Sequence, residues 1–348
     1  MVPGTPLPVA PAGSPPACSP PACSALASSA PARTPAVRPG GRSAALTGDY
    51  RRLRELCPAL RLHLLDPAEP DPSAADGWYS GARLATDERA LAAVLAGAEE
   101  RIAAEHGRAP RPHVTASRLL HHYAWSVCLL IAGPWHLARR VPAVDPADLW
   151  LHAPTGDLAL RPRGHVTRPC DDELRAELRA AVVAHLEPVL AAFAGPTRRR
   201  DRALWGMVTD DLASAVWYLG RMLDAQDGAA AGSTPRGATP RGATARGATA
   251  GGAKAGGATA VGATAGGVSG GGVTSGEDAA VAAAAALLPG GTLPLPGAAD
   301  FRWLRTPDGQ DHHTRTRLGC CLYYAVGPEA LACLTCPRTT DEERIRWL

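Results

Sequence analysis

Two long segments of this 348-residue chain cannot contribute to a hydrophobic core. Residues 1–47 are mostly proline, alanine and serine, and residues 227–277 repeat glycine, alanine and threonine, as in RGATPRGATARGATA. Segments of this composition bury too little apolar surface to offset the entropy that is lost on ordering them. We therefore expect a disordered tail at 1–47, a flexible linker at 227–277 and about 250 residues of folded structure between and after them.

The two segments also hold the positive charge of the chain. The tail carries three arginines and no acid, and the linker carries four bases and two acids, whereas the whole chain has a net charge of only +3. The remaining residues are therefore slightly acidic, near −2. This distribution argues against a folded basic face that binds nucleic acid.

The start of the chain lacks the basic residues and the apolar run of a secretory signal. The most apolar segment, residues 119–138, is interrupted by His121, His122, Pro134 and His136, so it predicts a buried helix rather than a membrane span. We expect a cytoplasmic protein without a transmembrane span. Peripheral association with a membrane is compatible with this expectation.

Apolar residues at helical spacing predict a mainly α fold. After a short helical start that Pro58 interrupts, helices are expected from a cap at Thr86 to Gly107 and over about 115–132, 171–193 and 200–224. Two short apolar runs around residues 154–157 predict a small β-hairpin. These elements form an expected helical domain at 48–226, and residues 278–348 form an expected small C-terminal domain that ends in a helix capped by Thr340.

The 200–224 helix contains the candidates for a ligand pocket. They are Trp205, Trp217 and Tyr218, together with Arg202 and Arg221. The helical spacing of the two tryptophans favours positions in the core, and the two arginines favour positions in solvent.

Other polar and sulfur-containing residues suggest no chemistry of their own. We expect the acidic pair of the 200–224 helix, Asp210 and Asp211, to lie on a solvated face. The pair His312 and His313 is expected at the surface. Cys57 and Cys128 lie within helices and are expected to be small core residues. Cys18, Cys23 and Cys170 are isolated thiols.

Four of the nine cysteines, Cys320, Cys321, Cys333 and Cys336, lie within 17 residues near the C-terminus. Clustered cysteines in a reducing cytosol favour metal binding over disulfides. A zinc site draws paired C-x(2–4)-C turns, and only the pair 333/336 has this form. A two-iron cluster accepts a vicinal pair more readily, because each iron takes two thiolates. A redox pair at 333/336 would leave the vicinal pair 320/321 without a role. The residues alone therefore leave three interpretations open, with an iron–sulfur cluster favoured over a zinc site and a zinc site over redox thiols.

The spacing C-C-x(11)-C-x(2)-C, within GCCLYYAVGPEALACLTCP, resembles the C-terminal signature of the FhuF-type ferric siderophore reductases. That family carries C-C-x(10)-C-x(2)-C, so the interval here is one residue longer, and Leu334 and Thr335 stand where a glycine is common. The segment RALWGMVTDDLASA at 202–215 is also similar to a recurring helix of the family. The similarity is strong over 300–348 and around 200–223, faint over the rest of the helical domain, and absent from the tail and the linker.

The resemblance implies a [2Fe–2S] cluster held by Cys320, Cys321, Cys333 and Cys336, in a small C-terminal iron–sulfur domain. It implies a ferric siderophore reductase, an oxidoreductase that acts on metal ions and releases Fe(II), with a hydroxamate-type ferric siderophore as substrate. An external electron donor, such as a ferredoxin or a flavin or NAD(P)H reductase, is required, because the chain has no dinucleotide-binding fingerprint. The alternatives are a zinc-stabilised binding module and a general iron–sulfur electron-transfer protein.

Overall fold

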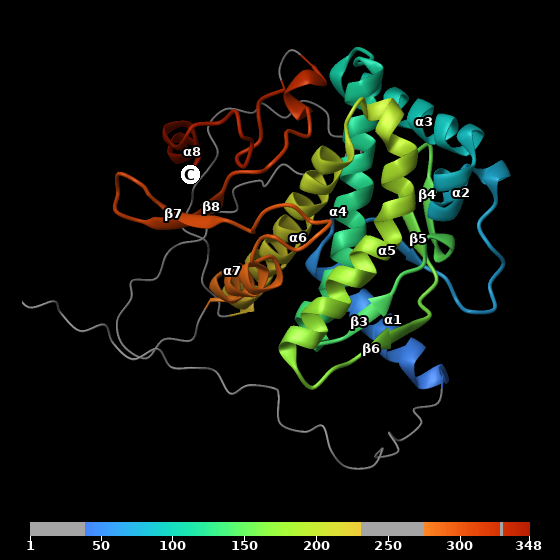
Figure 1. The fold of residues 1–348 in the computed structure, drawn as a ribbon, viewed down its shortest axis with the longest axis horizontal. Coiled ribbons are helices and arrows are strands. Elements are labelled where there is room, and N and C mark those ends of the chain that lie inside the picture. Colours follow the sequence, from blue (N-terminus) through green and yellow to red (C-terminus); the bar gives the residue numbers. More distant parts are fainter. Residues whose placement is uncertain (1–38, 231–274, 328–329) are drawn as a thin grey trace, which may run out of the picture. The chain divides into compact units, whose positions relative to one another are not determined.

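The structure is a computed structural model that describes residues 39–230, 275–327 and 330–348, and these residues belong to one compact unit. The fold is mainly helical, as predicted, with small sheets (Figure 1). The helices of four or more turns are α1 (Pro39–Leu56), α3 (Glu88–His106), α4 (Pro112–Ala138), α5 (Asp171–Thr197) and α6 (Asp201–Ala230). Shorter helices are α2 (Gly81–Thr86), α7 (Gly276–Leu287) and α8 (Asp341–Trp347).

The helix ends follow local capping chemistry, with one correction to the prediction. Thr86 is the last residue of α2, and the cap of α3 is its neighbour Asp87, whose carboxylate accepts from the Arg89 and Ala90 N–H groups. Gly107 ends α3 in the left-handed conformation that glycine adopts without strain. Thr340 caps α8 in a capping box with Glu343, as the sequence predicts.

The predicted hairpin is present and belongs to a larger sheet. β4 (Leu149–His152) and β5 (Leu158–Leu160) pair in antiparallel fashion around the turn at residues 153–157. β1 (Leu62–Leu64) and β2 (Trp78–Ser80) complete a sheet of order β1-β5-β4-β2, in which β1 is parallel to β5. The strand pairs β3 (Val141–Ala143) with β6 (Gly164–Val166), and β7 (Phe301–Arg305) with β8 (Asp311–Arg315), form two further small sheets.

Helix α4 is the centre of the core. It packs against α1, α3, α5 and α6, and every residue from Leu119 to Trp135 except His122 is buried (Figure 1). This confirms the prediction that the apolar segment 119–138 is a buried helix. Such a helix is apolar on all sides because it has a neighbour on all sides.

Helix α1 begins before the predicted boundary of the folded part. Its first residue is Pro39, and Leu46 is fully buried in the core, so residues 39–47 do not belong to a disordered tail. Residues 1–38 of that predicted tail, and residues 231–274 of the predicted linker, lie outside the described residues. The last residues of α6 and the first of α7 take up the ends of the predicted linker range.

Helix α7, at the start of the C-terminal part, packs into the core of the helical body. Ala280, Ala284 and Leu287 of α7 belong to the same hydrophobic core as α4, α5 and α6. Helix α7 crosses α6 at Gly220, where a Cβ atom would overlap both the Ala280 side chain and the Gly276 carbonyl oxygen. The predicted boundary at 278 therefore does not coincide with a break in packing.

By length and hydropathy, α5 is the one helix in the described ranges that could cross a membrane. One face of α5, including Leu178, Val182 and Phe193, is fully buried against the rest of the protein. A core helix of a soluble protein has the same properties, so this feature does not place the protein in a membrane.

His185 of α5 is a neutral, fully satisfied histidine in the core. Its Nε2 atom lies 2.9 Å from the Tyr123 hydroxyl, and its Nδ1–H donates to the Val144 carbonyl oxygen at 2.7 Å. Burial lowers the pKa of His185 from 6.5 to about 4. The unfolded chain binds this proton near pH 6.5 and the folded chain only near pH 4, so the stability due to the neutral ring is present above pH 6.5 and is lost as the pH falls toward 4.

We expect the free energy of unfolding to fall by on the order of 1–3 kcal/mol per such histidine between pH 7 and pH 4. Burial lowers the pKa of His122 to about 4 as well, so its contribution has the same sign. Urea unfolding of His185→Gln across this range should show a less steep dependence on pH than the unchanged protein. The matched control is His113→Gln at a partly exposed position. Equal slopes for His185→Gln and the unchanged protein would contradict the assignment.

Candidate metal centre

The four C-terminal cysteines lie on irregular backbone between β8 and α8. Cys320 and Cys321 follow β8 and precede a single 3-10 turn at Tyr323–Ala325, and Cys333 and Cys336 flank a tight turn in which the Cys336 N–H donates to the Cys333 carbonyl oxygen at 2.9 Å. Cys321 and Cys336 are buried, and Cys320 and Cys333 are partly exposed. We call these four residues the cysteine site.

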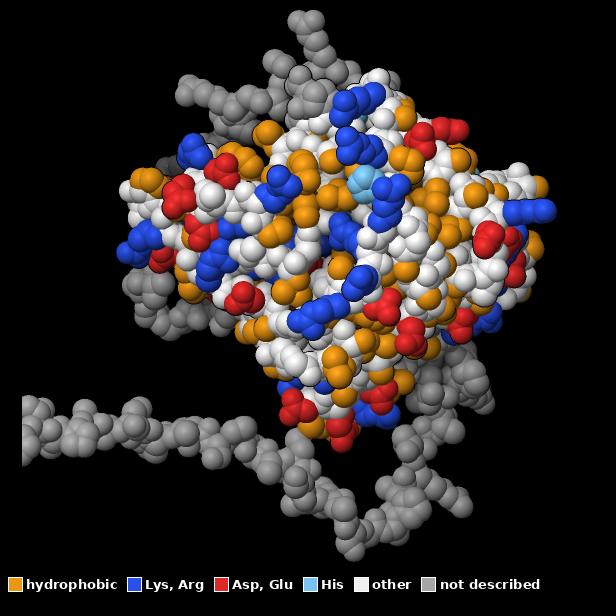
Figure 2. All heavy atoms as spheres, turned by 45° about the horizontal axis from the view of Figure 1, so that its top comes forward, with side chains coloured by type: hydrophobic (Ala, Val, Ile, Leu, Met, Phe, Trp, Pro, Cys, Tyr) orange, Lys and Arg blue, Asp and Glu red, His pale blue; other side chains and the backbone are white. Residues whose placement is uncertain are grey.

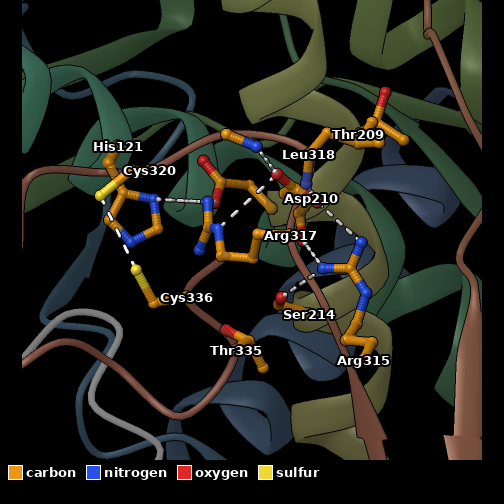
Figure 3. Close-up of polar contacts among 12 residues, drawn as sticks. His121, Thr209, Asp210, Ser214, Arg315, Arg317, Leu318, Cys320, Thr335 and Cys336 are labelled. Carbon is orange, nitrogen blue, oxygen red and sulfur yellow. Dashed lines mark hydrogen bonds and ion pairs between the residues drawn. The ribbon is translucent and has the colours of Figure 1, made fainter. Parts of the chain in front are cut away.

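The fold brings the four sulfurs together in two pairs, each with one member from either end of the segment. Cys320 Sγ lies 3.8 Å from Cys336 Sγ (Figure 3), and the Cys321 side chain hydrogen-bonds that of Cys333. The described cysteines are all free thiols. Across the ranges that the structure describes, no three His, Cys, Asp or Glu side chains are already arranged around one point as ligands of an ion. The sulfurs therefore form two pairs rather than one four-sulfur cage.

The hydrogen bond between Cys321 and Cys333 separates the acidities of the two thiols. It lowers the pKa of Cys321, with further lowering from His121 and two nearby arginines, and it raises the pKa of Cys333 together with burial. Burial raises the pKa of Cys320 to about 11. Within this pair, the hydrogen bond thus favours the thiolate on Cys321 and the thiol on Cys333.

Asp210 of α6 holds the backbone turn that leads into the cysteine site. Its carboxylate accepts hydrogen bonds from the Leu318 and Gly319 N–H groups at 3.0 Å each, and from Arg315 Nη2 at 2.7 Å (Figure 3). Asp210 and Arg315 are both fully buried. A carboxylate without water needs all of these donors, so the turn and the ion pair depend on each other.

Asp211 makes a second buried ion pair beside the first. Its Oδ1 atom lies 2.6 Å from Arg317 Nη2 and 2.7 Å from His121 Nδ1 of α4. Burial alone would lower the pKa of Arg317, but the carboxylates of Asp211 and Asp210 outweigh burial and raise it. Arg315 and Arg317 are two positions apart, so on extended chain their side chains leave the same side and reach the adjacent carboxylates of Asp210 and Asp211.

Two further arginines hold backbone carbonyl groups of the cysteine site. Arg199, at the turn between α5 and α6, donates to the Cys320 carbonyl oxygen. Arg344 of α8 is buried and donates to the carbonyl oxygens of Leu334 at 2.6 Å and Cys336 at 2.9 Å. Both ends of the segment are therefore attached to side chains of neighbouring helices.

Three buried polar atoms at the site lack a hydrogen-bond partner. His121 Nε2 and Arg317 Nε suit a group with acceptor atoms, whereas Asp211 Oδ2 is itself an acceptor. The His121 and Arg317 side chains contribute positive charge that favours the Cys321 thiolate. The sulfides and thiolates of an iron–sulfur cluster accept such hydrogen bonds, so the surroundings of the four cysteines fit a [2Fe–2S] group.

The remaining candidates of the sequence lie mostly where they were expected. Trp205 and Trp217 are buried, so neither offers a wall for a ligand, and Tyr218 packs edge-on against Trp125. Arg202 is exposed, whereas Arg221 is partly buried over the Trp217 ring. Cys57 and Cys128 are fully buried in the core, as predicted, whereas Cys170 precedes α5 and is partly exposed. Cys18 and Cys23 lie outside the described residues.

Two predictions about polar residues are wrong. Asp210 and Asp211 are not on a solvated face, since both are fully buried. His313 is not a surface residue, because its side chain is only 8% exposed, stacks on Trp303 and lies 2.7 Å from Asp278 Oδ1. From Leu204 to Val208, just before the acidic pair, the helix is apolar on every side. A helix with this pattern is surrounded by other elements, so the pattern indicates that the two aspartates are buried as well.

The chain matches no protein-family model, and no curated protein matches it. The resemblance to the FhuF-type reductases therefore rests on the residues of the chain alone.

Proposed function

We propose that the cysteine site holds a [2Fe–2S] cluster and that the protein reduces ferric siderophores by one electron. The observation that carries the proposal is the arrangement of the four sulfurs in two pairs, Cys320 with Cys336 and Cys321 with Cys333. A two-iron cluster requires two thiolates at each iron, whereas a single zinc ion requires four around one point.

The sulfur distance in one pair is compatible with two ligands of a single tetrahedral metal ion. Two thiolates on one tetrahedral metal, each about 2.3 Å from the ion, lie about 3.8 Å apart. Cys320 Sγ and Cys336 Sγ are 3.8 Å apart, which is far longer than a disulfide bond. We infer that each pair would bind one iron, so that the vicinal cysteines 320 and 321 serve different irons.

Such a cluster supplies one-electron transfer without a proton or a covalent intermediate. The residues around it compensate the negative charge that an added electron brings. Arg199 and Arg317 provide positive charge near the thiolates, and the Leu322 N–H donates to Cys320 Sγ at 3.4 Å. Hydrogen bonds and charges of this kind raise the potential at which an electron is accepted.

The chemistry suits ferric chelates bound through hard oxygen donors. Hydroxamate oxygens hold Fe(III) tightly and hold the softer, less charged Fe(II) weakly, so one added electron loosens the iron. The proposed partners are a hydroxamate-type ferric siderophore and an external donor such as a ferredoxin or a flavin or NAD(P)H reductase. The proposed location is the cytoplasm, where such donors work.

Anaerobic reconstitution with iron and sulfide tests the proposal. We expect two irons and two acid-labile sulfides per chain, a red-brown colour that dithionite bleaches, and an EPR signal in the reduced state. Cys320→Ser and Cys333→Ser should each lose most of this signal. Cys170→Ser is the matched control, since Cys170 precedes α5 and lies outside the cysteine site.

The other outcomes separate the alternatives. A colourless protein with one zinc ion per chain would replace the proposal with a zinc-stabilised module. A protein with the cluster that releases no Fe(II) from ferric hydroxamates would be a general electron carrier. Protein without metal or labile sulfide after reconstitution would end the assignment.

A further inference from the structure

The turn between α5 and α6 places a dense group of arginines beside the cysteine site. Four of the five residues from 198 to 202 are arginine, and the fifth is Asp201. Arg198, Arg200 and Arg202 are exposed, and Arg199 between them donates to the Cys320 carbonyl oxygen. A fifth arginine, Arg338, is exposed two residues after Cys336. We call Arg198, Arg199, Arg200, Arg202 and Arg338 the arginine patch.

Two arginines of this patch are held in place. Arg198 ends α5 in the left-handed conformation, with φ of 57°, and its N–H donates to the Gly195 carbonyl oxygen at 3.1 Å. Arg338 stacks on the Tyr324 ring at 4.5 Å and donates to its hydroxyl at 2.9 Å. Arg338 is therefore held at the side chain and Arg198 at the backbone, whereas Arg200 and Arg202 are exposed on the same turn.

Two exposed apolar side chains lie close in sequence to the cysteines. Leu318 is 52% exposed and precedes Cys320 by two residues, and Leu331 is 66% exposed and precedes Cys333 by two residues. The end of the bundle where α5 meets α6 turns toward the viewer in Figure 2, where basic side chains gather over the middle of the face with hydrophobic ones between them. Acidic side chains lie mainly toward the edges of that face.

We propose that the arginine patch and the exposed leucines Leu318 and Leu331 form the docking surface for an acidic electron-donor protein. This rests on the proposed function, since it assigns the donor's place at the cysteine site. A surface on which basic and apolar side chains are interspersed suits a short-lived complex, in which charge guides the encounter and little area is buried. The transfer is one electron, lost by the reduced donor and gained at the cysteine site.

Charge complementarity selects the protein donor over the chelate. Three hydroxamates carry three negative charges and neutralise Fe(III), so a ferric trihydroxamate has no net charge to be attracted by arginines. An acidic protein surface is attracted, and steering of this kind raises association rates by about 10- to 1000-fold at low salt. The positive charge of the arginine patch therefore matches an acidic protein and does not match an uncharged ferric chelate.

The test uses a flavodoxin, an acidic one-electron donor whose flavin reports its own state. Arg198→Glu, Arg200→Glu and Arg202→Glu are combined in the full chain, which leaves Arg199 on the Cys320 carbonyl. The matched control combines Arg51→Glu, Arg52→Glu and Arg54→Glu, exposed on α1. Binding of oxidised flavodoxin is measured by titration, and oxidation of its hydroquinone anion to the neutral semiquinone is followed by stopped flow.

At low salt we expect the patch variant to bind flavodoxin at least about tenfold more weakly, and to oxidise it at least about tenfold more slowly, than the control variant. The difference should shrink at about 0.5 M salt, where exposed charges are screened. At about 0.5 M salt, where its own negative charge is screened as well, dithionite needs no docking surface and should reduce both variants at the same rate.

Equal binding by the patch and control variants would overturn the proposal. If, in addition, dithionite-reduced protein reduced a ferric hydroxamate more slowly in the patch variant alone, the patch would serve the chelate instead. Failure of the proposed function is a separate result. In that case no cluster forms, and the binding titration, which needs none, still decides whether the surface docks an acidic protein.

Discussion

Replacing Asp210 with alanine is expected to cost about 3–5 kcal/mol of stability, the range for breaking one partner out of a buried ion pair. The substitution leaves the Arg315 guanidinium fully buried without its carboxylate. It also removes the acceptor for the Leu318 and Gly319 N–H groups, which hold the turn before Cys320. We therefore expect both a lower urea midpoint and a loss of iron and sulfide after reconstitution.

A second variant separates the two effects. Asp210→Ala combined with Arg315→Leu removes both buried charges, so most of the lost stability should return. The two N–H groups of the turn still lack their acceptor, so iron and sulfide content should stay low. Asp227→Ala, at an exposed position of the same helix, is the control and should change little. A wild-type midpoint and iron content in Asp210→Ala would show that the turn does not depend on this carboxylate.

Replacing Gly220 with alanine is expected to destabilise the protein by about 1–3 kcal/mol, as overpacking does in a close contact. The added Cβ atom overlaps backbone and side chain of α7, so the two helices must move apart. Intrinsic helix propensity alone would make the alanine variant more stable by about 1 kcal/mol. A decrease in the free energy of unfolding would therefore show that the close contact with α7 outweighs helix propensity. Urea or thermal unfolding measures this change.

Gly228→Ala on the same helix is the matched control. A Cβ atom there meets nothing within 4 Å, so we expect a neutral or stabilising effect. If Gly220→Ala were as stable as Gly228→Ala, α7 would not be fixed against α6. The C-terminal residues would then form the separate domain that the sequence suggested.

The helices were predictable because they depend on local patterns. Apolar periodicity placed α3 and α5 within four residues of their ends and the start of α6 within one, whereas α6 continues six residues beyond its predicted end. The Thr340 cap and the turn at Gly156 are local chemistry. The strands β1 and β2 were missed because each has three residues and is stabilised by partners far away in sequence. Such short strands carry no periodicity that a sequence could reveal.

The cluster of four cysteines was identifiable because rare residues that recur within a short segment stand out in the sequence. The residues that support them were not. Asp210 and Asp211 look like any acidic pair on a helix, and their burial follows only when β8 and the following chain bring Arg315 and Arg317 against α6. The arginine patch was hidden by a net charge near zero for the folded part, because an average over residues says nothing about where charges gather.

The sequence by itself therefore determined the helical class, the cap at Thr340 and the four cysteines, since each depends on residues close together in the chain. The tertiary structure decided which sulfurs meet, why two carboxylates are buried and where the arginines face. These properties arise from contacts across about 100 residues of sequence, such as Arg315 with Asp210, and they exist only once burial has removed water from both partners.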